Sequence, residues 1–510
     1  MDQLIRKKVL LFDRLVEKVD QLKKQGKVVV QTHGVFDLIH PGITQHLALA
    51  RKQGDICVAT VIKDKDVRRG PGRPIFNETL RAENLAALNL VDYVTLVDDE
   101  TPFECVRVLK PDVFARGQSQ NERDHKIHEK IFKQEKELYF GKSKLFETGL
   151  FSYSSSQFIN NFTENYSPEV RDFLKNFSEK YSFNNIVDRL NQLKKLKVVL
   201  IGDGIIDEYH YCEPMGKSAK SNLVVSRYVD HEVFAGGAFA IANHVASICE
   251  KVQLVSLLGE EDSREEFIRN NLKPNVKAQL FSRSDGPTVI KKRYLHKYLN
   301  QKLHEINYLN DQPVNEKLEK KIIKYLSTHL PKFDLVLVSD FGHGFISPLI
   351  YDAIEKHAKI LAINAQTNGA NTGYNLITKY HNPNYACLDE PEVRLAAQAK
   401  YQNIDEVASS IRERLNADYL ITTQGKKGSI GVNRENQINR TPIFSTRVID
   451  TVGAGDAFFA YTAPCFAQKM PLDFVSFIGN AVGALAVQIM GNKKAVEKSE
   501  LLEFVNALLK

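Results

Sequence analysis

The residues best suited to chemistry lie in the stretch DTVGAGDAFFA at 450–460. Gly453, Ala454 and Gly455 are small, so their backbone N–H groups can converge at the start of an expected helix, where the helix dipole adds positive potential. This arrangement is typical of an anion hole for a phosphoryl group in transfer. Asp456 is placed to accept the proton of an attacking hydroxyl group, as the base of a kinase must. For the motif alone, the alternative is a glycine-rich turn with an N-capping aspartate.

Two stretches of the chain each predict the beginning of an α/β sheet. Residues 16–34 and 187–204 both read as an amphipathic helix with a basic end, followed by a short β-branched run that stops at a glycine. Basic residues suit a helix C-terminus, and such apolar runs are typical of buried parallel strands. Strands and helices alternate after each start, so we expect an α/β protein with two doubly wound parallel-sheet domains.

The expected domain boundaries follow changes in composition. Residues 24–160 are expected to form the first domain and residues 196–510 the second. Residues 161–195 are polar with interspersed aromatic side chains, which predicts a helical connector rather than a disordered linker. Residues 209–234 alternate like strands and lack a helical period. We therefore expect a small separate sheet there that covers a site.

Composition and charge narrow the classes of function. The net charge of +7, from 69 basic and 62 acidic residues, is mild for 510 residues and suits anionic small substrates. The basic residues are dispersed without an aromatic–basic repeat, so no nucleic-acid partner is expected. No apolar run approaches the roughly 18 residues of a membrane helix, so no membrane partner is expected. The six cysteines are scattered, which predicts reduced thiols in a cytoplasmic protein.

The second domain contains a series of short motifs in the order LIGDGIIDEY, AGGAFAIANHVASI, VSDFGHG, TTQGKKGSIGV, DTVGAGD and GNAVGALAV. With these motifs in this order, the domain resembles the ribokinase-like sugar kinases, the PfkB family. The resemblance implies a ribokinase-like fold with a small β lid, ATP as the phosphate donor, and Asp456 as the base. It implies sugar contacts from Asp207, Gly236, Gly237 and Asn243. It implies nucleotide contacts from Thr423, Gly425, Gly428 and Asn480.

Within this family, the domain shows a particular likeness to the heptose-phosphate kinase half of bacterial ADP-heptose synthases. The stretch PTVIKKRYLHKYLNQKLHEIN aligns with their phosphate-contacting strand, which implies that Lys291 and Arg293 contact a sugar phosphate. The alternative for these two residues is a solvated basic edge. In the family's metal-associated Asn-x-x-Glu motif, Cys387 replaces Asn and Glu390 remains. Where those kinases carry Asp-Pro-Lys, this chain has NAQ at 364–366.

The stretch THGVFDLIHPGI at 32–43 contains a Gly-x-Phe-Asp element followed by most of a His-x-Gly-His element. With these elements the first domain resembles the cytidylyltransferase-like nucleotidylyltransferases, again with a likeness to the ADP-heptose synthases. The resemblance implies that His40 stabilises the phosphates of a nucleotide, and that Arg73 and Glu78 belong to the same site. It implies further nucleotide contacts from Gly34, Phe36, Asp37, Gly42, Arg81, Arg116, Ser154, Ser155 and Ser156. For the serine run, the alternative is a simple helix N-cap.

The closing histidine of the His-x-Gly-His element is replaced by Ile43. Isoleucine cannot donate a hydrogen bond, and losing one donor from such a site costs about 2.7–4 kcal/mol. Three interpretations stay open at this point. His46 substitutes from one helical turn further on, or His33 substitutes from the strand end. In the third, the domain only binds nucleotide or is a relic, although most of its other motif residues remain.

Together the two resemblances predict a bifunctional enzyme. The kinase phosphorylates the anomeric oxygen of a sugar phosphate, and the transferase joins a sugar 1-phosphate to ATP or CTP. The product is an NDP-sugar for a surface polysaccharide such as lipopolysaccharide. Magnesium (Mg2+) is implied in both domains, because charge on the phosphates must be neutralised.

The order of the domains and the state of the transferase leave an alternative. The ADP-heptose synthases carry the kinase first, and this chain has the reverse order. The alternative is an active sugar kinase whose N-terminal domain only binds nucleotide or dimerises. The small sheet is expected to be a lid or the clasp of a homodimer, since the kinase family uses it for both.

Overall fold

Two units of the chain fold around separate sheets. The computed structural model describes residues 3–67, 74–98, 102–117, 143–148, 166–299, 301–445 and 448–509. One unit comprises residues 1–184 and 503–510, and the other comprises residues 185–502. The expected boundary at residues 160 and 161 lies outside the described residues, so the predicted domain limits stay a prediction.

The first unit contains a five-stranded parallel sheet in the order β3-β2-β1-β4-β5. Its strands are β1 (Val29–Gly34), β2 (Ile56–Ile62), β3 (Tyr93–Val97), β4 (Val113–Gly117) and β5 (Lys144–Thr148). Its helices are α1 (Gln3–Lys8), α2 (Phe12–Lys24), η1 (Asp64–Asp66), α3 (Pro41–Arg51), α4 (Glu78–Ala86), α5 (Phe103–Leu109) and α8 (Pro168–Lys180). Strand order reverses at β1, which lies between β2 and β4, and ligands of such sheets bind at this switch point. This is the doubly wound fold that the sequence predicts.

The second unit contains a nine-stranded sheet in the order β10-β9-β6-β13-β14-β15-β16-β17-β18. Its strands are β6 (Lys197–Gly202), β9 (Lys251–Glu261), β10 (Val276–Pro287), β13 (Leu335–Asp340), β14 (Leu361–Ala365), β15 (Tyr385–Asp389), β16 (Tyr419–Thr423), β17 (Ser429–Asn433) and β18 (Ile438–Thr441). The strands from β10 to β16 are parallel, and β17 and β18 form an antiparallel edge. The runs VVLI and LVLV in β6 and β13 are buried on both faces, as parallel strands require.

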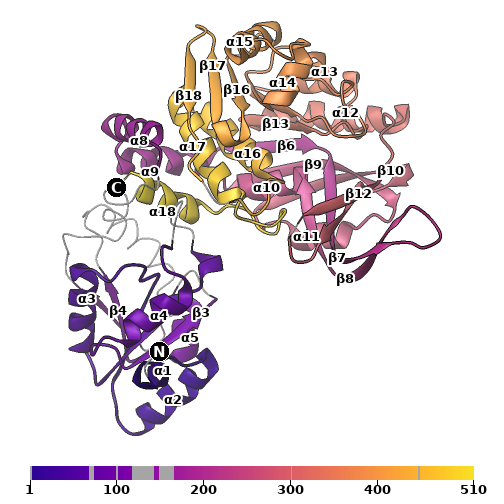
Figure 1. Ribbon diagram of the computed structural model, residues 1–510. Coiled ribbons are helices and arrows are strands. Elements are labelled where there is room, and N and C mark those ends of the chain that lie inside the picture. Colours follow the sequence, from indigo (N-terminus) through magenta and orange to yellow (C-terminus); the bar gives the residue numbers. More distant parts are fainter. Residues whose placement is uncertain are drawn as a thin grey trace. The chain divides into compact units, whose positions relative to one another are not determined.

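Helices cover both faces of this sheet (Figure 1). The helices and single turns within the second unit are η2 (Leu193–Lys195), α10 (Ala238–Ala246), α11 (Glu265–Asn271), α12 (Glu316–His329), η3 (Leu330–Lys332), α13 (Pro348–His357), η4 (Ile377–Lys379), α14 (Glu390–Ala397), α15 (Ile404–Leu415), η5 (Gly425–Lys427), α16 (Ala454–Ala467) and α17 (Leu472–Ala486). Two further helices, α9 (Phe183–Gln192) and α18 (Lys498–Leu508), each contain a bound between the two units. One large core joins α12, α13, α14 and α15 to the sheet. Helix α16 packs against both α10 and α17. Helices α16 and α17 are buried on nearly every side, which is why their residues are apolar on nearly every side.

A small sheet forms in the second unit, in the order β12-β11-β7-β8. Its strands are β7 (Gly204–Lys217), β8 (Val224–Gly237), β11 (Ile290–His296) and β12 (Lys302–Tyr308). The sequence predicts the hairpin of β7 and β8. It does not predict that β11 and β12, from about 80 residues further on, extend this hairpin into four strands.

Within the described residues, no helix combines the length and the apolar character needed to cross a membrane.

Candidate active sites

A cavity of 1620 Å³ in the second unit brings together most of the residues that the sequence indicates for phosphoryl transfer. The small sheet supplies one part of its wall, and the carboxyl ends of the large sheet and the start of α16 supply others. The predicted site residues that line it are Asp207, Gly237, Lys291, Arg293, Glu390, Thr423, Gly425, Gly428, Gly453, Ala454, Gly455, Asp456 and Asn480. Gly236 lies directly behind, because a Cβ there would fall 2.1 Å from Oδ2 of Asp207.

Asp456 lies in the first turn of α16, where backbone N–H groups have no partner within the helix. The chain enters the helix through Gly453 at a φ of 82°, and a side chain at this position would meet Asn492 at 2.2 Å. Burial raises the pKa of the Asp456 carboxyl to about 7, and the charge of Asp207 adds to the rise. A hydrogen bond from Gln366 and the charge of Lys291 act in the opposite direction. A carboxyl that titrates near neutral pH suits a general base.

Charged side chains surround Asp207 on the sugar side of the cavity. Arg293 donates to Oδ1 of Asp207 and also lies 2.7 Å from the carboxylate of Glu305. The amide of Asn492 donates to Oδ2 of Asp207 at 3.2 Å. Burial, together with the charge of Arg293, lowers the pKa of Lys291, whose ammonium lies 5.9 Å from the ring centre of Phe341. Neither cation lies on a solvated edge, and Arg293 is neutralised by two carboxylates.

Another part of the cavity wall contains the residues that the sequence indicates for nucleotide contacts. Gly425 begins the single turn η5 and Gly428 follows it, and both have positive φ values, of 55° and 86°. A side chain on Gly428 would fall 2.0 Å from the carbonyl oxygen of Thr441, so only glycine fits there. Asn480 on α17 donates to the Ser429 hydroxyl at 2.6 Å, which fixes its amide beside the turn.

Glu390 is the carboxylate that the sequence associates with magnesium. Burial raises its pKa, but hydrogen bonds from Gln424 at 2.7 Å and Arg394 at 2.8 Å outweigh this and hold the pKa below its ordinary value. Within the described residues, no cluster of three or more His, Cys, Asp or Glu residues is arranged to hold a metal. Magnesium bound to a nucleotide needs only one or two carboxylates besides water and phosphate oxygens. Glu390 supplies one ionised carboxylate, which would bind the ion through lone pairs that its bonds to Gln424 and Arg394 leave available.

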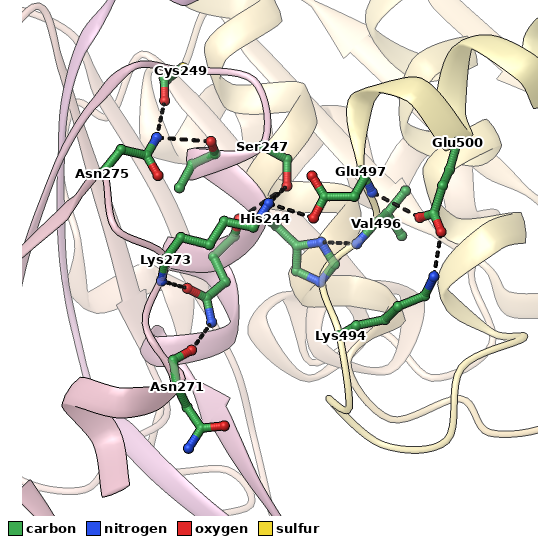
Figure 2. A network of polar contacts seen from close by, with 12 residues as sticks. His244, Ser247, Cys249, Asn271, Lys273, Asn275, Lys494, Val496, Glu497 and Glu500 are labelled. Carbon is green, nitrogen blue, oxygen red and sulfur yellow. Dashed lines mark hydrogen bonds and ion pairs between the residues drawn. The ribbon is translucent and has the colours of Figure 1, made fainter. Parts of the chain in front are cut away.

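Asn243 corrects one expectation, because it does not line the cavity. Its amide donates to the carbonyl of Asn271 at 2.8 Å and accepts from the N–H of Lys273 at 2.9 Å. Figure 2 shows the surrounding network, in which Lys273 contacts Ser247 and Glu497, and His244 accepts from the N–H of Val496. Asn243 therefore joins α10 to neighbouring loops. Asn243 is the sixth residue of α10, which begins at Ala238 after its N-cap Gly237, and it lies outside the lining of the cavity.

Asp450 has a role that the sequence analysis does not assign. Its carboxylate accepts from the Tyr209 hydroxyl at 2.7 Å, the Lys302 ammonium at 2.8 Å and the N–H of Gly491 at 3.1 Å. It thereby connects two strands of the small sheet to the loop before α16. Burial raises its pKa, but the bonds from Lys302 and Tyr209 outweigh this and keep the carboxyl ionised. The available signal was its position at the start of the DTVGAGD motif.

The candidate transferase site lies at the carboxyl end of β1. Asp37 accepts from the N–H groups of Ile75 at 2.8 Å and Phe76 at 3.0 Å, and Phe36 adopts a positive φ of 52°. Gly34 ends β1, and Gly42 donates its N–H to Nδ1 of His40 at 3.2 Å. His40 is thus the N-cap of α3, next to a helix N-terminus suited to anions. Burial lowers its pKa.

Arg81 corrects a second expectation, because its side chain is fully buried. Its guanidinium donates to the carbonyls of Val35, Ile62 and Phe76 and to the carboxylate of Asp64. An arginine has five N–H donors, and these contacts occupy most of them. Arg81 therefore holds the loops of the site together and does not offer its charge to a nucleotide.

The region of Ile43 bears on the interpretations of the missing histidine and argues against one of them. Ile43 packs against an apolar cluster that includes Phe36 and Leu47. His46 is buried with both ring nitrogens occupied, by Thr32 at 2.6 Å and Thr148 at 2.7 Å. Burial lowers its pKa to about 4, so it is neutral at ordinary pH. Substitution by His46 is therefore wrong. His33 lies at the end of β1 with Nδ1 3.1 Å from the Thr60 hydroxyl.

The remaining residues expected at the transferase site fall into two groups. Arg73, Ser154, Ser155 and Ser156 lie outside the described residues. Arg116 lies on β4, the strand next to β1 at the switch point of the sheet, and its side chain is half-buried. Glu78 accepts the N–H of Asp64 at 2.7 Å, which makes it a further scaffold residue of this site.

Comparison with known proteins places both regions in families. A cytidylyltransferase-like family model matches residues 32–159. The "Bifunctional protein HldE" of Syntrophotalea carbinolica is 40% identical over 112 residues, which cover 22% of this chain and 23% of that protein. The protein of the same name from Trichlorobacter lovleyi is 23% identical over 315 residues, which cover 61% and 63%. The matches thus span less than two thirds of these relatives. The expected pairing of a cytidylyltransferase-like region with a PfkB kinase region is confirmed, with the kinase second.

Solved structures support the fold of the second unit. Phosphofructokinase-2 from Escherichia coli, in complex with substrates and products, matches with a TM-score of 0.50 and 14% identity, over 62% of this chain and 100% of that chain. At this identity, the likeness shows the fold alone. The model of the pfkB family of carbohydrate kinases matches residues 195–498, which is more than half of the chain. The chain therefore belongs to the pfkB family of carbohydrate kinases.

Proposed function

We propose that this chain is a bifunctional enzyme of activated-sugar synthesis. The second unit transfers a phosphoryl group from ATP to the anomeric oxygen of a heptose-phosphate-like sugar. The first unit joins a sugar 1-phosphate to ATP or CTP, releases pyrophosphate and forms an NDP-sugar for a surface polysaccharide such as lipopolysaccharide. The family matches to residues 32–159 and 195–498 and the relatives named "Bifunctional protein HldE" support this pairing.

The kinase step follows from the position of Asp456. The sugar hydroxyl gives its proton to the Asp456 carboxylate while its oxygen forms a bond to the γ-phosphorus of ATP. The bond from that phosphorus to the bridging oxygen breaks, and ADP leaves. Stabilisation of the charge on the transferring group is assigned to the backbone N–H groups of Ala454 and Gly455 at the start of α16, although the N–H of Ala454 also lies 3.3 Å from the Thr451 carbonyl oxygen. Magnesium, associated with Glu390 when bound, supplies charge neutralisation on the phosphates.

Sugar recognition is assigned to the residues around Asp207. Its carboxylate would accept hydrogen bonds from sugar hydroxyls, and Arg293 and Asn492 hold it in place. Lys291 is the buried cation left for the substrate's own phosphate, because two carboxylates neutralise Arg293. Thr423, Gly425, Gly428 and Asn480 are the proposed nucleotide contacts at the other end of the cavity.

The observation that carries the proposal is a buried carboxylate at a helix N-terminus inside a large cavity. The test supplies the purified protein with magnesium, ATP or CTP, and heptose 7-phosphate, with heptose 1-phosphate in a parallel reaction. The 1-phosphate is needed because a phosphatase must remove the 7-phosphate between the two steps. We expect ADP and a sugar bisphosphate in the first reaction, and pyrophosphate and an NDP-heptose in the second. Absence of sugar-dependent ADP formation would contradict the kinase assignment.

A second candidate function applies to the first unit alone. Ile43 lies against an apolar cluster and His46 is bound between two threonines, so neither adds a phosphate donor beside His40. In this alternative, the first unit binds nucleotide without forming an NDP-sugar. Calorimetric binding of ATP or CTP without pyrophosphate release from heptose 1-phosphate would identify it. Pyrophosphate release would exclude it.

We also propose that the chain forms a homodimer through the small sheet and works in the cytoplasm. Several large apolar side chains of this sheet and its turns are exposed: Met215, Leu223, Val224, Val225, Tyr228, Leu299, Leu303, Ile306 and Tyr308. Large exposed apolar patches mark association surfaces. All six cysteines are free and buried, as suits a reducing compartment. A solution mass of one chain by light scattering would contradict the dimer.

A further inference from the structure

The side chain of Gln366 connects the base of the kinase site to the large sheet. Its Nε2 donates to Oδ1 of Asp456 at 2.6 Å and to Oδ1 of Asn364 at 2.9 Å. A glutamine amide has two N–H donors, so these two contacts use both of them. Gln366 lies 90 residues before Asp456 in the chain, and both line the cavity.

The orientation of the Gln366 amide is itself fixed. Asn364 donates from its own amide to the carbonyl of Cys387 at 2.8 Å, which turns its oxygen toward Gln366. The backbone of Gln366 is held on both sides, by its N–H to the Asp340 carbonyl at 2.8 Å and by the Asn375 amide on its carbonyl at 2.9 Å. The chain of amides therefore runs from β15 through β14 to the first turn of α16.

We propose that Gln366 is a positioning residue for the base, whose amide holds one oxygen of the Asp456 carboxylate so that the other faces the substrate hydroxyl. Among the described residues, Gln366 is the side chain that hydrogen-bonds this carboxylate. A neutral donor can fix the carboxylate without forming an ion pair that would hold its proton affinity low. This inference rests on the proposed kinase function.

The electrostatic surroundings of Asp456 support this role. Burial raises the pKa of Asp456. The negative charge of Asp207 on β7 raises it further, and the positive charge of Lys291 on β11 lowers it. The thiol of Cys387 on β15 is also nearby. The bond from Gln366 lowers the pKa. With Gln366 in place, the base titrates near pH 7. Without it, the carboxyl would hold its proton more tightly and also lose its orientation.

The test compares two substitutions with opposite expected effects on the pH profile. Gln366→Met removes the donor at similar length, and Gln366→Lys keeps a donor and adds a positive charge. With ATP, magnesium and heptose 7-phosphate, we expect Gln366→Met to lower kcat about tenfold or more, with a smaller change in the KM for ATP. The acidic limb of the kcat/KM pH profile of Gln366→Met should move to higher pH. In Gln366→Lys the same limb should move down by about one unit or more.

Matched controls separate positioning from a general structural effect. Gln402→Met and Gln402→Lys make the same changes at an exposed residue and should leave the profile of the native protein unchanged. If both Gln366 variants keep the native acidic limb while remaining folded, the inference is overturned. If the native protein itself forms no ADP with the sugar phosphate, the failure belongs to the proposed function.

A measurement without substrate tests the contact independently. The folded-state pKa of Asp456 exceeds its ordinary value of 3.8 and reaches about 7, so this group makes stability fall as pH rises between those values. The fall should extend to higher pH in Gln366→Met and shrink in Gln366→Lys, in denaturant unfolding from pH 4 to 8. Identical pH dependence in both variants and the native protein would also overturn the inference.

Discussion

The two candidate active sites of this chain differ in whether their polar residues line a cavity, although polar residues of both sites also bond to one another. Around Asp456, polar and charged side chains from β7, β11, β14 and α16 converge on a cavity of 1620 Å³. Around His40, several of the expected ligands are already committed to the protein. Arg81 bonds to three backbone carbonyls, and Asp37 accepts two N–H groups of the loop at 75–76. A motif residue can thus hold the loops of a site in place and need not contact the substrate.

The comparison suggests one question for each motif residue, namely whether its donors and acceptors are already bound within the protein or can still bind a ligand. Both ring nitrogens of His46 are bound within the protein. The ammonium of Lys291 instead lies in the wall of a cavity. Leaving a buried donor without a partner costs about 1–3 kcal/mol, so a satisfied group is not released cheaply to a ligand. Mutations at the two sites should therefore differ in whether they change rate or stability.

The largest expected effect is loss of the kinase base. Asp456→Asn keeps the shape of the side chain but cannot accept the proton, so sugar-dependent ADP formation should fall by about 10²–10⁴-fold. Pyrophosphate release from heptose 1-phosphate, which uses the other unit, should not change. A parallel loss of both activities would show that the two sites do not act separately.

Replacement of His40 and of His46 should sharpen the comparison within the first unit. His40→Ala removes a group at the N-terminus of α3, and we expect pyrophosphate release to fall by about 10²–10³-fold. His46→Val should lower the thermal stability while leaving the rate per folded molecule near the native value. A rate loss in His46→Val equal to that in His40→Ala would restore His46 as a catalytic candidate.

Arg81 should matter for stability more than for nucleotide affinity. Arg81→Met leaves several buried carbonyls and Asp64 without their donor, so we expect a loss of about 3 kcal/mol or more in the free energy of unfolding. Arg14→Ala, at an exposed arginine of the same unit, provides the control and should change stability little. A variant that unfolds normally but loses nucleotide binding would return Arg81 to the ligand set.

The smallest expected effect is a difference in the pH dependence of stability. The pKa of His46 is lowered from 6.5 to about 4 in the folded state, so its contribution to stability is present above 6.5 and is lost as pH falls toward 4. The raised pKa of Asp456 gives the opposite slope, with stability lost as pH rises from 3.8 toward 7. His46→Val and Asp456→Asn should each flatten one slope in urea unfolding. Unchanged slopes would contradict the lowered pKa of His46 and the raised pKa of Asp456.

Much of the fold was predictable from the sequence. The alternation of strands and helices, the β-branched runs and their terminal glycines predict two doubly wound sheets, because buried parallel strands need apolar residues on both faces. The sheet orders agree with this prediction. The four strands of the small sheet were less predictable, since β11 joins β7 across about 80 residues of intervening chain.

The sequence by itself determined which short motifs this chain carries, and hence its kinase family and the place of Asp456 at a helix start. These features are local, because a few neighbouring residues create a tight turn and a helix N-terminus. Only the tertiary structure decided which groups remain available for substrates. His46 meets Thr148 across 102 residues and Gln366 meets Asp456 across 90. Asn243 is likewise held by a loop about 30 residues away. Such partners come together only when distant strands and helices pack, so no spacing of residues along the chain reveals them.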